Sequence, residues 1–162
     1  NSPSMDIQVA SNFERLLYDL LKANSNRLSK VMKKFEIENI LSMEHDFQKN
    51  VLNSFLSYKV SEKRTLEIIK NVYRDYNLVL DPHTAVGCAA SLEYLQKYKN
   101  DIVVSLATAH PAKFSKSVYN AIKIKPLLPS RYKNIFNLEE KFKVLDNKYK
   151  EVKNYIFSNT LN

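Results

Sequence analysis

Residues 102–107 read Ile102-Val103-Val104-Ser105-Leu106-Ala107, and Thr108-Ala109-His110-Pro111 follow directly. A nearly continuous apolar run without alternation is typical of a central parallel strand covered on both faces. Pro111 favours the start of a helix, whose buried side would carry Phe114, Val118, Ala121 and Ile122. Because ligands of open α/β sheets bind beyond the carboxyl ends of strands, we expect chemistry at Thr108 and His110. Both residues could equally finish the strand and cap the helix.

The segment before this run predicts a second strand and another helix. Leu78-Val79-Leu80 is a short apolar run ending at Asp81, which can cap a helix that has Pro82 at its first position. The first half of this helix is rich in small residues: Ala85, Gly87, Cys88, Ala89, Ala90 and Ser91. They allow close approach of a bound molecule or of another backbone, and tight packing on a sheet is the simpler explanation.

The remaining pattern is helical. Ser11 and Glu14 fit a capping box for a helix that ends near Asn24. Asn24-Ser25-Asn26 predicts a loop before a short helix from Arg27 to Phe35, with Leu28, Val31 and Met32 inward. A helix from about Met43 to Tyr58 and one beginning after Ser61 would pack as an antiparallel pair.

The C-terminal region carries apolar residues at alternating spacings of four and three. They are Leu138, Phe142, Leu145, Tyr149, Val152 and Ile156. This seam would suit a coiled-coil partner. The seam spans fewer than three heptads and has two aromatic members. Such a short pattern is more typical of a helix folded back on its own domain than of a coiled coil.

The formal net charge of +8 raises the possibility of nucleic-acid binding. Arginine occurs only at positions 15, 27, 64, 74 and 131, and the lysines are scattered along the chain. Since arginine is the residue that recognises phosphates and base edges in a bidentate manner, a solvated lysine-rich surface is the better interpretation.

Cysteine, histidine and hydropathy patterns exclude several classes of site. Cys88 is the only cysteine, and its apolar neighbours favour a buried thiol in a reducing compartment. His45, which we expect to be exposed, His83 and His110 lack the spacing of a metal site. No run of about twenty apolar residues is present, so we expect no membrane span and a cytoplasmic location, with an organelle still open.

Two motifs resemble threonine synthases: Asp81-Pro82-His83-Thr84-Ala85-Val86-Gly87 and Leu106-Ala107-Thr108-Ala109-His110-Pro111-Ala112-Lys113-Phe114. The resemblance extends to residues 2–7, to residues 11–17 and to the end of the chain from Leu128 to Phe157, and is weak over residues 24–60. It implies a C-terminal portion of a pyridoxal-phosphate enzyme of fold type II, the tryptophan-synthase-β-like class. Such an enzyme converts O-phospho-L-homoserine and water to L-threonine and phosphate.

The resemblance also implies site residues. Thr108 matches the position whose hydroxyl meets the pyridine nitrogen of pyridoxal phosphate, and Asp81, His83, Thr84 and His110 would shape the cofactor pocket or its loops. Lys113 is expected to point to solvent or to an acidic partner. No lysine here matches the family's Schiff-base lysine, and a single glycine cannot build its glycine-rich phosphate loop. The chain alone is therefore expected to be inactive, with the missing N-terminal part of the same enzyme as its partner.

The expected fold is the mostly helical C-terminal part of a three-layer α/β protein with one or two parallel strands. We expect three segments: a helical segment over residues 1–77, a βα core over 78–125 and C-terminal helices over 126–162. Unpaired edges of the strand at residues 102–107 should leave apolar surface exposed. Two other functions stay open: a noncatalytic interaction module with this scaffold, and a basic helical domain that binds nucleic acid.

Overall fold

The structure, a computed structural model, describes residues 2–5, 7, 10–41, 51 and 54–160. The chain divides into two compact units, Asn1–Pro126 and Leu127–Asn162. The described residues are mostly helical, as predicted, and they contain no β-strand.

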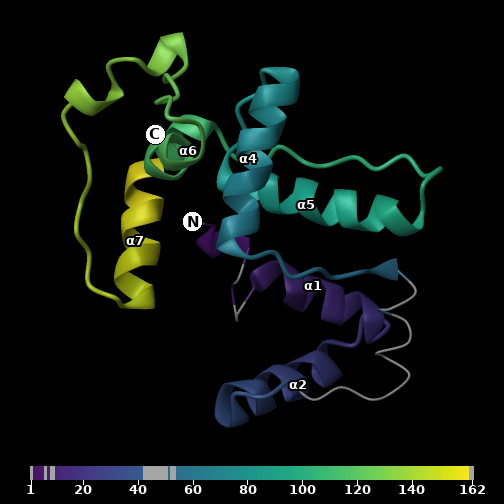
Figure 1. The fold of residues 1–162 in the computed structure, drawn as a ribbon. Helices are drawn as coiled ribbons and strands as arrows, with labels where there is room; N and C mark the ends of the chain where they lie inside the picture. Colours follow the sequence, from purple (N-terminus) through teal and green to yellow (C-terminus); the bar gives the residue numbers. More distant parts are fainter. Residues whose placement is uncertain (1, 6, 8–9, 42–50, 52–53, 161–162) are drawn as a thin grey trace. The chain divides into compact units, whose positions relative to one another are not determined.

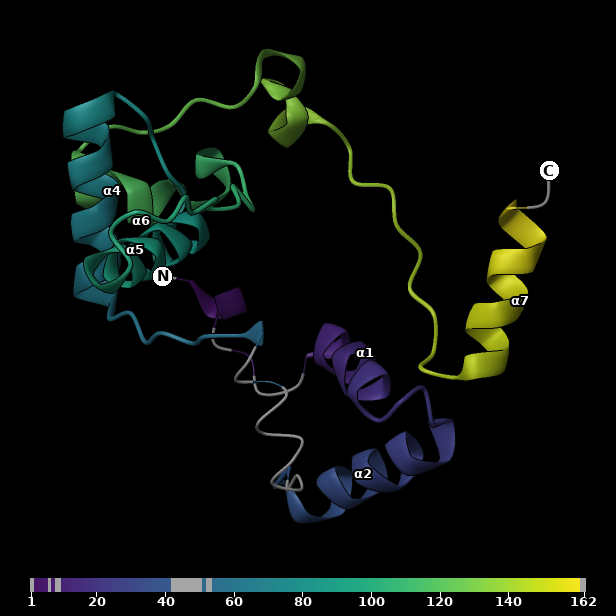
Figure 2. The same ribbon diagram turned by 90° about the vertical axis from the view of Figure 1, so that its right-hand side faces the viewer.

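The core of the first unit is a group of three helices. They are α4 (Glu62–Tyr76), α5 (Pro82–Lys97) and α6 (Ser115–Ile122), which lie together in both ribbon views (Figure 1, Figure 2). Ile68 and Ile69 of α4 are buried against Ala85 and Ala89 of α5, and Leu80 closes the cluster. Removal of these apolar side chains from water is the main contribution to the stability of this core.

The termini of these helices follow the sequence signals. Ser61 caps α4 by accepting the Arg64 N–H at 3.2 Å, and Asn77 ends that helix in the left-handed region with a φ of 52°. Asp81 caps α5, and Pro82 takes its first turn as predicted. The 3₁₀ turn η2 (Pro111–Phe114) leads into α6, so the helix start predicted at Pro111 is confirmed with one added turn of tighter winding.

Two helices precede this core, α1 (Ser11–Leu20) and α2 (Ser25–Glu38), and they pack on each other. The capping box at Ser11 is wrong: Ala10 holds the cap position, and no side chain bonds there. The predicted loop over residues 24–26 is confirmed at Asn24 and wrong beyond it: Asn24 is the extended cap whose side chain accepts the Arg27 N–H at 3.0 Å, and α2 begins at Ser25. A short 3₁₀ turn, η1 (Pro3–Met5), lies against α5.

The two predicted strands are absent from the described structure, and this corrects the expected sheet. Leu78–Leu80 and residues 102–107 form no strand, and no backbone hydrogen bond joins residues 102–107 to any described residue. A parallel strand exists only where a neighbouring strand completes its ladder, and the described chain supplies none. Instead, the chain after α5 turns and runs back along that helix towards α6 (Figure 1).

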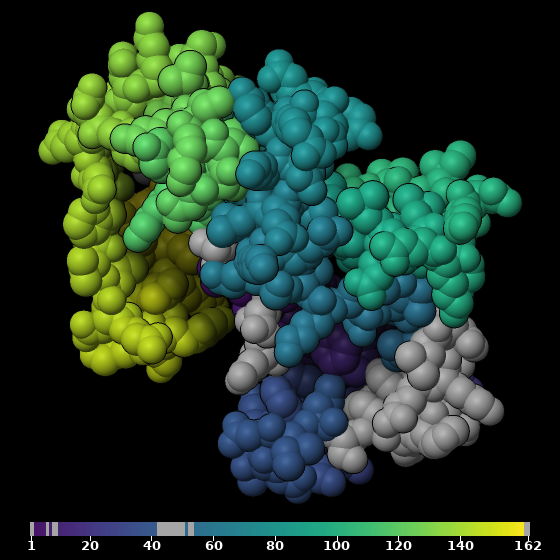
Figure 3. Space-filling view, viewed as in Figure 1, coloured from purple at the N-terminus to yellow at the C-terminus, as the bar shows by residue number. Residues whose placement is uncertain are grey.

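This returning segment exposes alternate apolar side chains. Ile102, Val104 and Leu106 are 95%, 81% and 74% exposed, whereas Val103 is 36% exposed. The segment lies at the right of the space-filling view in teal-green (Figure 3). The expectation of exposed apolar surface is therefore confirmed.

The second unit contains two 3₁₀ turns, η3 (Ser130–Tyr132) and η4 (Ile135–Asn137), and one helix, α7 (Tyr149–Thr160). The seam predicted from Leu138 is not a continuous helix, because residues 138–148 are irregular. Only its last members, on α7, are helical.

The helix predicted from Met43 to Tyr58 falls largely outside the described residues, as does His45. Its described end, residues 55–58, is not helical. Its pairing with α4 therefore stays a prediction.

Candidate functional site

The carboxylate of Asp81 organises a buried polar cluster at the N-terminus of α5. Asp81 is 1% exposed, and its Oδ1 accepts the backbone N–H groups of His83 at 2.9 Å and Thr84 at 3.4 Å. Its Oδ2 accepts the hydroxyl of Thr84. The positive end of the helix dipole adds to these hydrogen bonds in favouring a negative charge here.

Thr84 joins this cluster to the returning segment. Its Oγ1 accepts the backbone N–H of Thr108 at 3.2 Å, across 24 positions of the sequence. One turn further along α5, the thiol of Cys88 lies 3.5 Å from the hydroxyl of Ser105. A Cβ at Gly87 would lie 3.1 Å from that same hydroxyl oxygen. The small residues of α5 therefore leave room for the side chain of Ser105 on the returning segment.

His83 is buried between Asp81 and η2. Its Nδ1 lies 3.2 Å from the Asp81 carboxylate, and its ring centroid is 4.5 Å from that of Phe114. Because a carboxylate accepts hydrogen bonds, Nδ1 carries the proton. Its Nε2 is buried and has no hydrogen-bond partner among the residues that the structure describes.

His110 begins η2 as its cap residue. Its Nδ1 accepts the backbone N–H of Ala112 at 3.2 Å, so the capping interpretation is confirmed. The ring is exposed, and in its neutral form the proton is on Nε2. Lys113 is exposed as expected, with its Nζ 5.7 Å from the centre of the Phe114 ring.

The structure thus gathers Asp81, His83 and Thr84 with the backbone of Thr108 in one place. His110 lies two residues beyond Thr108, and its ring bonds the backbone of Ala112 rather than any of these four residues. The side chain of Thr108 is exposed, so its hydroxyl is accessible while its backbone is held.

Sequence reasoning missed one contact that holds the other end of the returning segment. The Tyr94 hydroxyl donates to Asp101 Oδ2 at 2.6 Å, and this bond, with burial and the Asp101 charge, raises the pKa of Tyr94 to about 12. Tyr94 also stacks on Tyr98 with ring centroids 4.6 Å apart. The sequence signal for this contact is a tyrosine one turn before the end of the helix, followed by an acidic residue just beyond the helix.

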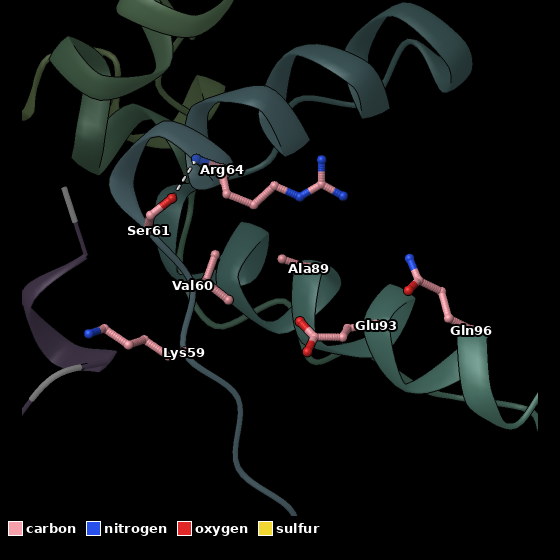
Figure 4. A pocket seen from close by; sticks show the side chains of 7 residues that line it. All are labelled: Lys59, Val60, Ser61, Arg64, Ala89, Glu93 and Gln96. Atoms are coloured by element: carbon pink, nitrogen blue, oxygen red, sulfur yellow. Dashed lines mark hydrogen bonds between the residues drawn. The ribbon is translucent and has the colours of Figure 1, made fainter.

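A cavity lies elsewhere, between α4 and the second half of α5. It has a volume of about 520 Å³ and is lined by Lys59, Val60, Ser61, Arg64, Ala89, Glu93 and Gln96. Figure 4 shows the lysine, arginine and glutamate side chains spread around an open hollow. None of the predicted site residues lines it, so it is separate from the polar cluster.

Across the described ranges, no three His, Cys, Asp or Glu side chains are grouped to hold a metal ion. Over the same ranges, no helix is both long and apolar enough to cross a bilayer.

Comparisons with known proteins give a consistent result. The model of a family described as the C-terminal part of threonine synthase matches residues 84–156. Threonine synthase of Pseudomonas aeruginosa is 39% identical over 156 residues, which cover 96% of this chain and 33% of that protein. The Saccharomyces cerevisiae threonine synthase is 34% identical and covers 90% of this chain.

Solved structures agree with the sequence relatives. The structure of pyridoxal-phosphate-bound threonine synthase from Brucella melitensis matches with a TM-score of 0.73 and 30% identity, over 96% of this chain and 33% of that one. The yeast enzyme matches with the same TM-score and 32% identity.

The fold therefore matches one portion of the threonine synthase structures. The chain belongs to the threonine synthase family, to whose C-terminal part it corresponds. It spans about a third of the length of the relatives that it matches.

Proposed function

We propose that this chain is part of an enzyme that converts O-phospho-L-homoserine and water to L-threonine and phosphate with pyridoxal phosphate. The observation that carries this proposal is the hydrogen-bonded cluster of Asp81, Thr84 and Thr108, which ties together the two motifs of the family resemblance. The pyridoxal phosphate named for the Brucella melitensis structure is the matching cofactor.

The residues present fit a pyridine nitrogen. Thr108 offers an exposed, uncharged hydroxyl on a backbone that Thr84 holds. Pyridoxal phosphate, when bound, supplies an electron sink for the substrate carbanion. A neutral hydroxyl would bind the ring nitrogen without holding it protonated, in contrast to an aspartate.

The other predicted residues have supporting roles in this proposal. Asp81 and His83 would shape the wall behind Thr108, since both are buried beneath the returning segment. His110 would set the direction of the chain after Thr108, because its ring caps η2. No catalytic proton transfer is assigned to any of them.

The rest of the same enzyme is the partner in this proposal. Ile102, Val104 and Leu106 present an apolar face, and the backbone groups of residues 102–107 have no partners among the described residues. A strand supplied by the part of the family that this chain does not span would satisfy both needs. The chain alone, which has one glycine and lacks the lysine motif, is then expected to release no phosphate.

The test is a pair of substitutions in the full-length enzyme. We expect Thr108→Val to weaken pyridoxal phosphate binding about tenfold, the order expected for one hydrogen bond, and to change the absorbance spectrum of the bound cofactor. Thr108→Ser keeps the hydroxyl without the β-branch that restricts χ1, so it should retain most of the wild-type affinity. Wild-type affinity and spectrum in Thr108→Val would refute the role of Thr108, and phosphate release by the 162-residue chain would refute its inactivity.

A further inference from the structure

Thr84 is a buried hydroxyl with two directed hydrogen bonds. Its side chain is 4% exposed, its Oγ1 donates to Oδ2 of Asp81, and the same oxygen accepts the Thr108 N–H at 3.2 Å. A hydroxyl has one proton and two lone pairs, and a carboxylate only accepts. The proton of Thr84 therefore points to Asp81, which leaves a lone pair for Thr108.

The carboxylate of Asp81, to which Thr84 donates, is itself held in place. Asp81 is 1% exposed and accepts the N–H groups of His83 and Thr84 through its Oδ1. These N–H groups belong to the first turn of α5, which is anchored in the core by Ala85 and Ala89. The position of the Thr108 backbone is thus tied to a rigid element rather than to a loop.

The returning segment has little other support near Thr108. Ala107 and Thr108 are exposed, and back along the segment the side chain of Ser105 contacts Cys88 of α5. Threonine is β-branched and stiff about χ1, so a fixed backbone also fixes the direction of its hydroxyl.

We propose that Thr84 is a positioning residue, which holds the backbone of Thr108 so that the Thr108 hydroxyl meets the cofactor nitrogen. This rests on the proposed function of Thr108. Thr84 itself touches neither cofactor nor substrate in this role. Two successive hydrogen bonds, from Thr84 to Asp81 and from Thr108 to Thr84, hold this position.

The first experiment measures amide hydrogen exchange of Thr108 in the 162-residue chain. Thr84→Val keeps the shape but loses both hydrogen bonds, so Thr108 should exchange about tenfold faster. Thr84→Ser restores the hydroxyl and should restore protection. Thr65→Val is the matched control, since Thr65 is 1% exposed and its hydroxyl bonds the Ser61 carbonyl at 3.0 Å within α4. Unchanged exchange of Thr108 in Thr84→Val would overturn the proposal.

The second experiment uses the full-length enzyme and titrates pyridoxal phosphate. We expect Thr84→Val to weaken binding and alter the cofactor spectrum in the same direction as Thr108→Val, with recovery in Thr84→Ser and no change in Thr65→Val. If Thr108→Val weakens binding and Thr84→Val does not, the positioning role is refuted and the proposed function stands. If neither substitution weakens binding, the role of Thr108 fails and the positioning role fails with it.

Discussion

The side chain of Asp81 makes four contacts, two with His83 and two with Thr84. Two backbone N–H groups, one hydroxyl and one imidazole lie around its carboxylate. The sequence predicted only the helix cap, which is a local interaction. The contacts of His83 and Thr84 follow from the same first helical turn, because residues two and three positions after the cap face back towards it.

The pairing of Tyr94 with Asp101 predicts a dependence on alkaline pH. The pKa of Tyr94 is raised from 10 to about 12 in the folded chain. A raised pKa means that the stabilisation is complete below pH 10 and is lost as the pH rises through 12. The difference in melting temperature between wild type and Tyr94→Phe should therefore be constant up to pH 10 and then decline.

Absorbance of tyrosinate at 295 nm offers an independent check of this prediction. The wild type should contain one tyrosine that titrates near pH 12 and is absent from Tyr94→Phe. Asp101→Asn removes the charge but keeps an acceptor, so the Tyr94 pKa should fall towards its ordinary value. A Tyr94 pKa near 10 in the wild type would contradict the contact.

Residue-level prediction succeeded for two local interactions, although the equally local capping box at Ser11 was wrong. The capping roles of Asp81 and His110 were both anticipated, since each bonds a backbone N–H within three positions. The bond between Thr84 and Thr108 could not be anticipated from spacing, because it depends on how the chain returns along α5. The family resemblance singled out both residues without giving this contact.

At the scale of elements, the returning segment determines which residues α5 can carry where the two are in contact. Gly87 has an ordinary helical backbone, so only the closeness of Ser105 explains a glycine there. In a helix, alanine is favoured over glycine by roughly 0.5–1 kcal/mol. We expect Gly87→Ala to be almost neutral in the wild type, because crowding against Ser105 offsets that gain, and to stabilise by roughly 0.5–1 kcal/mol in a Ser105→Ala background.

A double-mutant cycle by urea denaturation measures this coupling. Effects at Gly87 and Ser105 should be non-additive, as for residues in direct contact. Ser130→Ala, in the second compact unit, serves as the control partner and should give additive effects with Gly87→Ala. Additive free energies in the Gly87 and Ser105 cycle would contradict the close approach.

The predicted strand at residues 102–107 failed for a physical reason. A run of apolar residues indicates that a segment is buried in the complete fold, but it does not identify the element that covers the segment. Helices such as α4 and α5 satisfy their backbone groups internally and are formed here. A strand needs a partner from elsewhere, and none lies within the described residues.

At the scale of the whole molecule, exposed apolar surface predicts association. Ile102, Val104 and Leu106 are each more than 70% exposed and lie on one side of the returning segment. We expect the purified chain to self-associate at micromolar concentrations, as observed by sedimentation velocity, because burial of this surface is favourable. Replacement of all three residues by lysine should shift the chain towards the monomer.

The control for this experiment adds the same charge at another site. Leu138, Phe142 and Val144 are also exposed and belong to the second compact unit. If their replacement by lysine reduces association equally, net charge rather than the returning segment is responsible. A monomeric wild type would contradict the prediction itself.

The helical character and most helix starts were predicted from the sequence, because caps and apolar periodicity are encoded within about ten residues. The seam at residues 138–148 shows the limit of this approach, since its spacing suits a helix and yet the chain is irregular there. Periodicity indicates which face a helix would bury, whereas formation of that helix depends on a surface to bury it against.

The thiol of Cys88 offers a kinetic probe of the contact between α5 and the returning segment. It is the only cysteine of the 162 residues, it is half-buried, and it bonds the hydroxyl of Ser105 on the returning segment. A thiol-specific reagent would therefore modify one position, and we expect its rate to rise when that segment lifts away from α5. Labelling kinetics would thus give the lifetime of the contact without any substitution in the protein.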